Sequence, residues 1–194
     1  MRALSLGDLD PLSLVGGSGG FGLIERGQYD LAIESQRKKL ELDPNYPFAY
    51  EALGRAYSGK GMYPEAIANL QKAVDLSGGT PHFLSALGYT YGVWGKRNEA
   101  LKILHQLTLL SKRRYVLPYD IARVYLGLGE KDRAFDWLQK AVADRSIGPP
   151  SLWSKEMDSI RSDPRYAELI RRIGFPPETT RQLIGLQNLR SQKQ

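Results

Sequence analysis

The chain has 194 residues, of which 42% are hydrophobic and 25% charged, and this composition excludes a disordered polypeptide. It contains no cysteine, which excludes disulfides, thiolate zinc sites and cysteine nucleophiles and indicates a reducing compartment. No run approaches the roughly 18 apolar residues of a membrane span, and Asp8 and Asp10 lie where a signal peptide needs an apolar stretch. We therefore expect a cytoplasmic protein without membrane contact.

One pattern of large and small residues recurs every 34 residues along the chain. The copies are Tyr50, Leu53, Gly54, Tyr57, Gly61, Ala66, Leu70 and Ala73; Leu84, Leu87, Gly88, Tyr91, Gly95, Ala100 and Leu104; and Pro118, Ile121, Ala122, Tyr125, Gly129, Ala134, Leu138 and Ala141. A shift backwards by the same period finds Gly27, Tyr29 and Ala32. Three consecutive copies in one phase indicate a structural repeat.

This order and period resemble the tetratricopeptide repeat, in which each unit is a pair of antiparallel helices. The resemblance implies an all-α fold: a right-handed superhelix of about four helix pairs, stacked because one pair cannot bury its apolar faces alone. It also implies a scaffold that binds a peptide or protein partner in a concave groove. We expect no enzymatic activity and no cofactor or metal.

Helix-breaking residues separate the expected units in chain order. Pro44 ends the first unit, Pro81 opens the third, and Gly61, Gly95 and Gly129 mark turns inside units, where a left-handed cap suits glycine. We expect units at residues 13–46, 47–80, 81–114 and 115–146, within a repeat region of residues 1–146. The first unit should be the weakest, because its first helix is rich in glycine and its second carries Gln36 and Lys39 at core positions.

After residue 147 the period fails. Gly148-Pro149-Pro150 interrupts the chain, a short helix is expected within 151–160, and Asp163-Pro164 opens a helix over 165–173 with one apolar face. We interpret residues 147–177 as capping helices that cover the fourth unit. Residues 178–194 form a tail that could add one more amphipathic helix.

A narrower resemblance covers residues 27–177. Two segments in this range are similar to the C-terminal repeat region of bacterial signalling proteins. They are Gln28-Tyr29-Asp30-Leu31-Ala32-Ile33 and Ile160-Arg161-Ser162-Asp163-Pro164-Arg165-Tyr166. There the region follows a winged-helix, serine/threonine kinase or nucleotide cyclase domain. The resemblance implies a sensing or docking module, and our chain could begin in the middle of a longer ancestor.

Two motifs suggest chemistry that their surroundings do not support. Gly17-Ser18-Gly19-Gly20-Phe21-Gly22 matches a phosphate-binding glycine pattern, but no kinase catalytic motif follows and no strand precedes it. The two histidines, His82 and His105, have no cysteine to join them in a metal site and are expected at the surface. We assign no catalytic residue.

The tetratricopeptide resemblance places positions two, five, six and nine of each unit in the groove. The polar and aromatic residues at those positions are Phe48, Glu51, Arg55, His82, Ser85, Tyr89, Tyr119, Asp120 and Arg123. They suit a peptide with mixed charge and an apolar anchor, and Ala52, which replaces an expected Asn, argues against a clamp for a C-terminal carboxylate. We expect Tyr89→Ala with Arg123→Ala to weaken partner binding about tenfold without unfolding the protein.

Two alternatives remain open at this stage. A self-associating module is one, because an incomplete first unit would expose an apolar face that tends to pair with a second copy. A nucleic-acid-binding module is the other, motivated by the net charge of +6. Nucleic acid is the less favoured partner, because the basic residues form short scattered runs rather than one dense tract.

Overall fold

The structure is a computed structural model that describes residues 20–174, and all of its regular structure in that range is helical. The helices are α2 (Gly20–Glu25), α3 (Tyr29–Leu42), α4 (Pro47–Gly59), α5 (Tyr63–Leu76), α6 (Pro81–Val93), α7 (Arg97–Ser111), α8 (Pro118–Gly127), α9 (Lys131–Ala143), α10 (Pro149–Trp153), the 3₁₀ turn η2 (Lys155–Met157) and α11 (Pro164–Ile173). The all-α prediction is confirmed. The expected start of the first unit at residue 13 and the tail at 178–194 lie outside the described residues.

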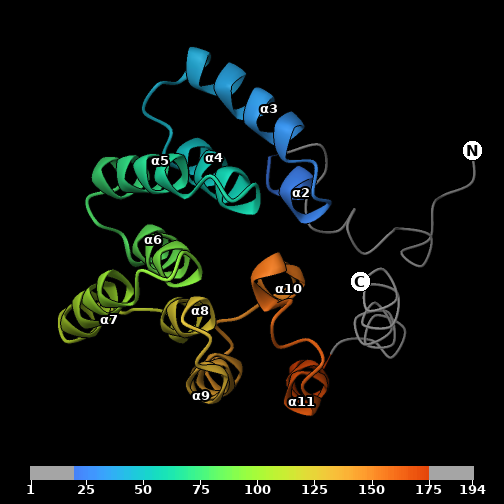
Figure 1. Ribbon diagram of the computed structural model, residues 1–194. Helices are drawn as coiled ribbons and strands as arrows, with labels where there is room; N and C mark the ends of the chain where they lie inside the picture. The colour runs from blue at the N-terminus through green and yellow to red at the C-terminus, as the bar shows by residue number, and fades with distance from the viewer. Residues whose placement is uncertain (1–19, 175–194) are drawn as a thin grey trace, which may run out of the picture.

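Successive helix pairs follow one another along an arc (Figure 1). Helices α2, α4, α6 and α8 lie on the inner side of the arc, and α3, α5, α7 and α9 lie on its outer side. Helix α10 lies inside the arc, in the space that the inner helices surround. The chain therefore places one of its own C-terminal segments on the concave side.

Local sequence explains where the helices begin and turn. Proline occupies the first turn of α4, α5, α6 and α8. A backbone N–H in the first turn has no partner within the helix, so the N–H that proline lacks costs no hydrogen bond there. Gly61, Gly95 and Gly129 have φ values of 74°, 77° and 72°, a left-handed conformation that side chains disfavour. The predicted glycine turns are confirmed.

Buried apolar side chains form three clusters. A small one joins α2, α3 and α4 through residues such as Ile24 and Ile33, a larger one joins α5 to α8, and the third joins α8 and α9 to α10, η2 and α11. The third cluster contains Leu152, Trp153 and Met157 from the C-terminal segment. The C-terminal helices therefore pack on the fourth unit, while the first unit has the smallest core.

The glycine-rich motif ends inside a helix rather than in a phosphate-binding loop. Gly20 and Gly22 are buried in α2, and a Cβ atom built on Gly20 would lie 2.3 Å from the side chain of Gln36 on α3. The absence of a side chain at Gly20 thus allows α2 to approach α3. Gly17 and Gly19 lie outside the described residues.

Helices α6 and α8 approach one another at a pair of glycines. A Cβ atom on Gly127 would lie 2.3 Å from the backbone oxygen of Tyr89, and one on Gly92 would lie 2.5 Å from the backbone carbon of Gly127. Backbone atoms cannot move aside without shifting a whole helix. This contact sets the spacing between the third and fourth units.

We predict that Gly127→Ala lowers the free energy of unfolding by about 1–3 kcal/mol, the usual effect of overpacking. The matched control is Gly129→Asn, because φ at Gly129 is 72°, its Cβ would meet open space, and Asn tolerates that conformation. Urea unfolding followed by circular dichroism compares the two. Equal stability of both variants would contradict the close-approach account.

Candidate partner-binding site

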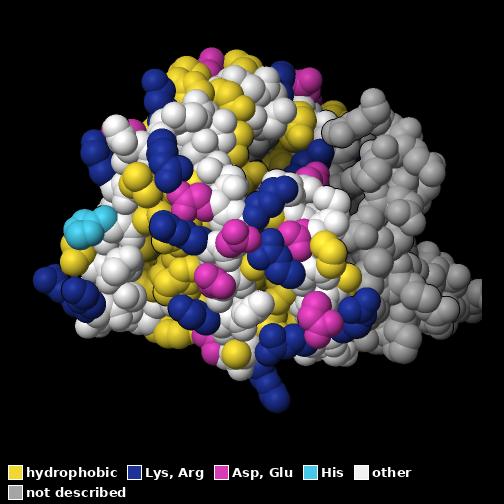
Figure 2. All heavy atoms as spheres, turned by 60° about the horizontal axis from the view of Figure 1, so that its bottom comes forward, with side chains coloured by type: hydrophobic (Ala, Val, Ile, Leu, Met, Phe, Trp, Pro, Cys, Tyr) yellow, Lys and Arg dark blue, Asp and Glu magenta, His cyan; other side chains and the backbone are white. Residues whose placement is uncertain are grey.

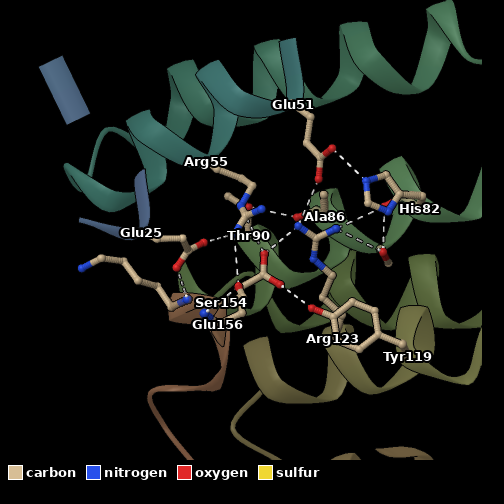
Figure 3. A network of polar contacts seen from close by, with 12 residues as sticks. Glu25, Glu51, Arg55, His82, Ala86, Thr90, Tyr119, Arg123, Ser154 and Glu156 are labelled. Atoms are coloured by element: carbon tan, nitrogen blue, oxygen red, sulfur yellow. Dashed lines mark hydrogen bonds and ion pairs between the residues drawn. The ribbon is translucent and has the colours of Figure 1, made fainter. Parts of the chain in front are cut away.

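The nine residues predicted to line the groove all lie on inner helices. Phe48, Glu51 and Arg55 are on α4, His82, Ser85 and Tyr89 are on α6, and Tyr119, Asp120 and Arg123 are on α8. Most of them belong to one set of hydrogen bonds and ion pairs, which we call the inner-face network (Figure 3). We define it as Glu25, Glu51, Arg55, His82, Ser85, Tyr119, Asp120, Arg123, Ser154, Lys155 and Glu156.

Arg123 lies at the centre of the inner-face network, with only 2% of its surface exposed. Its Nη2 atom lies 3.2 Å from Glu51 Oε1 and 2.6 Å from Glu156 Oε1, and Nη1 donates to the His82 carbonyl oxygen at 3.3 Å. A buried charge is tolerated only when it is paired and hydrogen-bonded. The two carboxylates meet that requirement for Arg123.

Glu156 belongs to the C-terminal turn η2, not to a repeat. Besides Arg123, it accepts a hydrogen bond from the Tyr119 hydroxyl at 3.3 Å and lies 3.6 Å from Arg55 Nε. The Arg161 guanidinium fixes the backbone just before this turn, because it donates to the carbonyl oxygens of Trp153 and Ser154 at 2.7 and 2.9 Å. The turn therefore presents Glu156 to the two inner-face arginines.

The same turn also contacts the first described helix. Arg55 Nη2 donates to Glu25 Oε1 at 2.9 Å and to Ser154 Oγ at 3.1 Å, and the Lys155 backbone N–H donates to Glu25 Oε2 at 2.6 Å. Sequence reasoning missed Glu25 and Ser154–Glu156 as site residues. The 34-residue pattern contains no signal for them. Glu25 is not at one of the groove positions of its unit, and Ser154, Lys155 and Glu156 come after the last repeat.

The nine predicted groove residues differ in how far they are exposed. Glu51, Ser85, Tyr119, Asp120 and Arg123 are all buried, and of the nine residues only Phe48, at 43%, is strongly exposed. The His82 side chain is 39% exposed and that of Arg55 17%. Of the buried residues, Glu51, Tyr119 and Arg123 still line one of the two pockets described next, whereas Ser85 and Asp120 line neither.

What remains open is a pair of pockets. One, of about 270 Å³, is lined by residues that include Tyr29, Tyr89 and Val93. The other, of about 280 Å³, is lined by residues that include Phe21, Phe48 and His82. Arg55 and Glu156 line both pockets. Their contact is therefore the wall between the two spaces.

The pKa values of the four carboxyl groups in the inner-face network shift in different directions. Burial raises the pKa of Glu51, but the His82 hydrogen bond and the charges of His82 and Arg123 outweigh burial and lower this pKa to about 2. Burial also opposes ionisation of Glu156, yet Arg123 and Arg55 lower its pKa. For Glu25 and Asp120 burial prevails, and their pKa values are raised. Four carboxylates thus face two guanidiniums, and two of the four are the more easily protonated.

The inner-face network consists of hydrogen bonds and ion pairs between side chains of several helices. Within residues 20–174 no three His, Asp or Glu side chains are grouped so that they could hold a metal ion. In the same range, no helix is long and apolar enough to cross a membrane. His105 is exposed on α7, and no residue of the inner-face network lies on that helix.

Comparison with known proteins agrees with the helix pairs. Residues 49–79, which span α4 and α5, match the family described as tetratricopeptide repeat. No curated protein matches the chain. Among solved structures, the crystal structure of MamA is similar over 100% of both chains, with 18% sequence identity and a TM-score of 0.43. The fold and the family match define a helical-repeat protein. Within that fold, residues 49–79 are similar to one tetratricopeptide repeat.

The burial of Arg123 changes the expected outcome of the Tyr89→Ala with Arg123→Ala variant. Removing Arg123 leaves Glu51 and Glu156 buried without their central cation, so we predict that Arg123→Ala alone lowers the free energy of unfolding by about 3–5 kcal/mol. Arg97→Ala, which removes a guanidinium that is mostly exposed, is the matched control and should change stability by less than about 1 kcal/mol. Urea unfolding measures both. Similar stability of the two variants would contradict the network.

A pH series tests the lowered pKa of Glu51. A carboxyl whose folded-state pKa is lowered stabilises the fold above its unfolded pKa of 4.5, and this stability is lost as the pH falls towards 2. We predict that Glu51→Gln is less stable than the parent at pH 7 and that the difference shrinks between pH 4.5 and pH 2.

The control for the pH series is Glu168→Gln, because the Glu168 side chain is 60% exposed. That variant should track the parent at every pH. A stability difference for Glu51→Gln that stays constant down to pH 2 would show that the Glu51 carboxylate is not held in its charged form.

Proposed function

We propose that this protein is a protein-interaction scaffold that holds a segment of a partner protein at its inner face, in the two pockets beside the inner-face network. The observation that carries the proposal is the combination of repeat architecture with open, largely apolar pockets on the concave side. Tetratricopeptide arrays are built to present such concave surfaces.

Aromatic side chains at the rim supply the anchoring surface. Phe48 contacts His82 and Phe83 with ring centroids 5.9 and 5.0 Å apart, and it remains 43% exposed. Tyr89 lines the other pocket. Aromatic residues carry much of the binding energy in protein interfaces. A partner with an apolar side chain for each pocket fits this surface better than a uniformly charged one.

The finer role follows from sequence resemblance alone. Residues 27–177 are similar to the repeat region of bacterial signalling proteins, so we propose a regulatory or sensing module that docks a partner in the cytoplasm. Of the buried groove positions, Ser85 and Asp120 would then act indirectly, by shaping the pockets, while Glu51 and Arg123 line one of them.

A nucleic-acid partner is less well supported. Figure 2 shows basic side chains interspersed with acidic ones on one face rather than gathered in a tract. Several are paired with acids, such as Lys38 with Glu34 and Lys102 with Glu99. Such pairs reduce the number of free cations available to phosphates.

Self-association through the N-terminal repeat is a second proposal. Leu31 and Leu42 of α3 are 53% and 89% exposed, and exposed apolar side chains favour contact with another copy. Light scattering at increasing concentration tests it. The parent should show a mass above 21.7 kDa and Leu31→Ser with Leu42→Ser should not; a strict monomer in both cases would refute self-association.

The scaffold proposal is tested by capture and titration. Proteins retained by the purified chain are identified, and each is then titrated calorimetrically against the parent, Phe48→Ala with Tyr89→Ala, and Tyr115→Ala as an exposed aromatic control outside both pockets. We predict at least roughly tenfold weaker binding for the double variant only, with its melting temperature recorded alongside. Unchanged affinity in the double variant would remove the partner from the inner face.

A further inference from the structure

Two different kinds of contact hold Ser154–Glu156 inside the arc. On one side the neighbouring residues Leu152, Trp153 and Met157 are buried in an apolar cluster with α8, α9 and α11. On the other side, the contacts to α2 and α4 are hydrogen bonds and ion pairs. The C-terminal segment is therefore anchored to the fourth unit by its core and attached to the first two units by polar groups.

The apolar clusters show the same division. Among the described residues, the cluster of α2, α3 and α4 shares no side chain with the cluster that contains α10 and η2. Each unit of a solenoid contacts its neighbours, and the two ends ordinarily meet nothing. Here the ends are joined, and the junction consists of polar contacts together with the Lys155 ammonium 5.6 Å above the Tyr29 ring.

Arg55 makes most of that junction. Its guanidinium contacts Glu25 and Ser154 at 2.9 and 3.1 Å and lies 3.6 Å from Glu156. With 17% of its side chain exposed, it is reached by water, unlike Arg123. An ion pair that water can enter separates at lower cost than one sealed in a core, because the freed charges are solvated at once.

We propose that Arg55, with Glu25, Ser154 and Glu156, is a latch that closes the arc, and that the concave face opens by separation of α2 and α4 from the C-terminal turn. Opening leaves the three apolar clusters intact, because no cluster spans the latch. It must also part Glu51 of α4 from the Arg123–Glu156 pair, since Glu51 Oε1 lies 3.2 Å from Arg123 Nη2. Since Arg55 and Glu156 form the wall between the two pockets, opening joins them into one channel. The proposal rests on the proposed scaffold function and adds its regulation: a long partner segment binds the open form.

The chain suits a direct distance measurement, because it contains no cysteine. Arg26→Cys and Ser159→Cys place spin labels at two exposed positions beside the latch, one after α2 and one after η2. Electron–electron distance measurement on the unbound protein should give one narrow distribution. In Arg55→Gln we expect a second, longer distance, and in the matched control Arg97→Gln we expect the parental distribution.

Hydrogen exchange provides the second readout. The Lys155 amide donates to Glu25, so latch opening should expose it and raise its exchange rate at least roughly tenfold in Arg55→Gln, the loss expected for a hydrogen bond to a charged group. Exchange in α6 to α9 should stay at the parental rate. A parental distance distribution together with parental exchange at Lys155 would overturn the proposal.

Arg55→Gln could unfold the first unit instead, which faster exchange throughout α2 to α5 would reveal. In that case Arg55→Lys decides, because lysine keeps the charge but its single nitrogen cannot occupy both the Nη2 position beside Glu25 and Ser154 and the Nε position beside Glu156. A longer distance in a folded Arg55→Lys supports the latch, and an unchanged distance refutes it. These measurements need no partner. If the arc does not open but a partner still binds, the latch proposal alone is wrong. If the arc opens but no partner binds, the scaffold function alone is wrong.

Discussion

The buried contact of Arg123 with Glu51 and Glu156 is the interaction on which the rest of the structure depends. Removing a guanidinium from water costs several kcal/mol unless carboxylates compensate it. Glu51 comes from α4, Arg123 from α8 and Glu156 from the C-terminal turn, so one ion cluster ties together the second unit, the fourth unit and the cap. That requirement, together with the apolar packing of Trp153 and Met157 against α8 and α9, holds η2 inside the arc.

This arrangement changes what a tetratricopeptide groove offers to a partner. An uninterrupted concave face accepts an extended or helical segment along its length. Here Glu156 and Arg55 cross that face and leave two pockets of similar size. Under the proposed function, partner recognition depends on apolar side chains that enter the pockets, while Arg55 and Glu156 between them maintain the shape. Beside this bridge, the Lys155 N–H donates to Glu25, 130 residues away, so the first unit and the C-terminal turn support one another.

Much of the fold could be predicted from the sequence, because a 34-residue period reports directly on helix pairs. Gly61 and Gly129 occur where the turns need a positive φ, and the predicted groove residues all lie on inner helices. Their burial could not be predicted. A repeat pattern describes contacts between neighbouring units, and it says nothing of Glu156, which enters through a turn shaped by Arg161. Glu25 was missed for the same reason.

The most direct test of the central claim is a double-mutant cycle on Arg123 and Glu156. Arg123→Met, Glu156→Gln and the double variant are unfolded in urea, and the coupling energy is the part of the double change that the single changes do not explain. The account predicts that each single variant is strongly destabilised and that the pair is coupled by at least about 1.5 kcal/mol, within the range of close charge pairs. Additive effects, with coupling below about 0.5 kcal/mol, would contradict a C-terminal turn held inside the arc by Arg123.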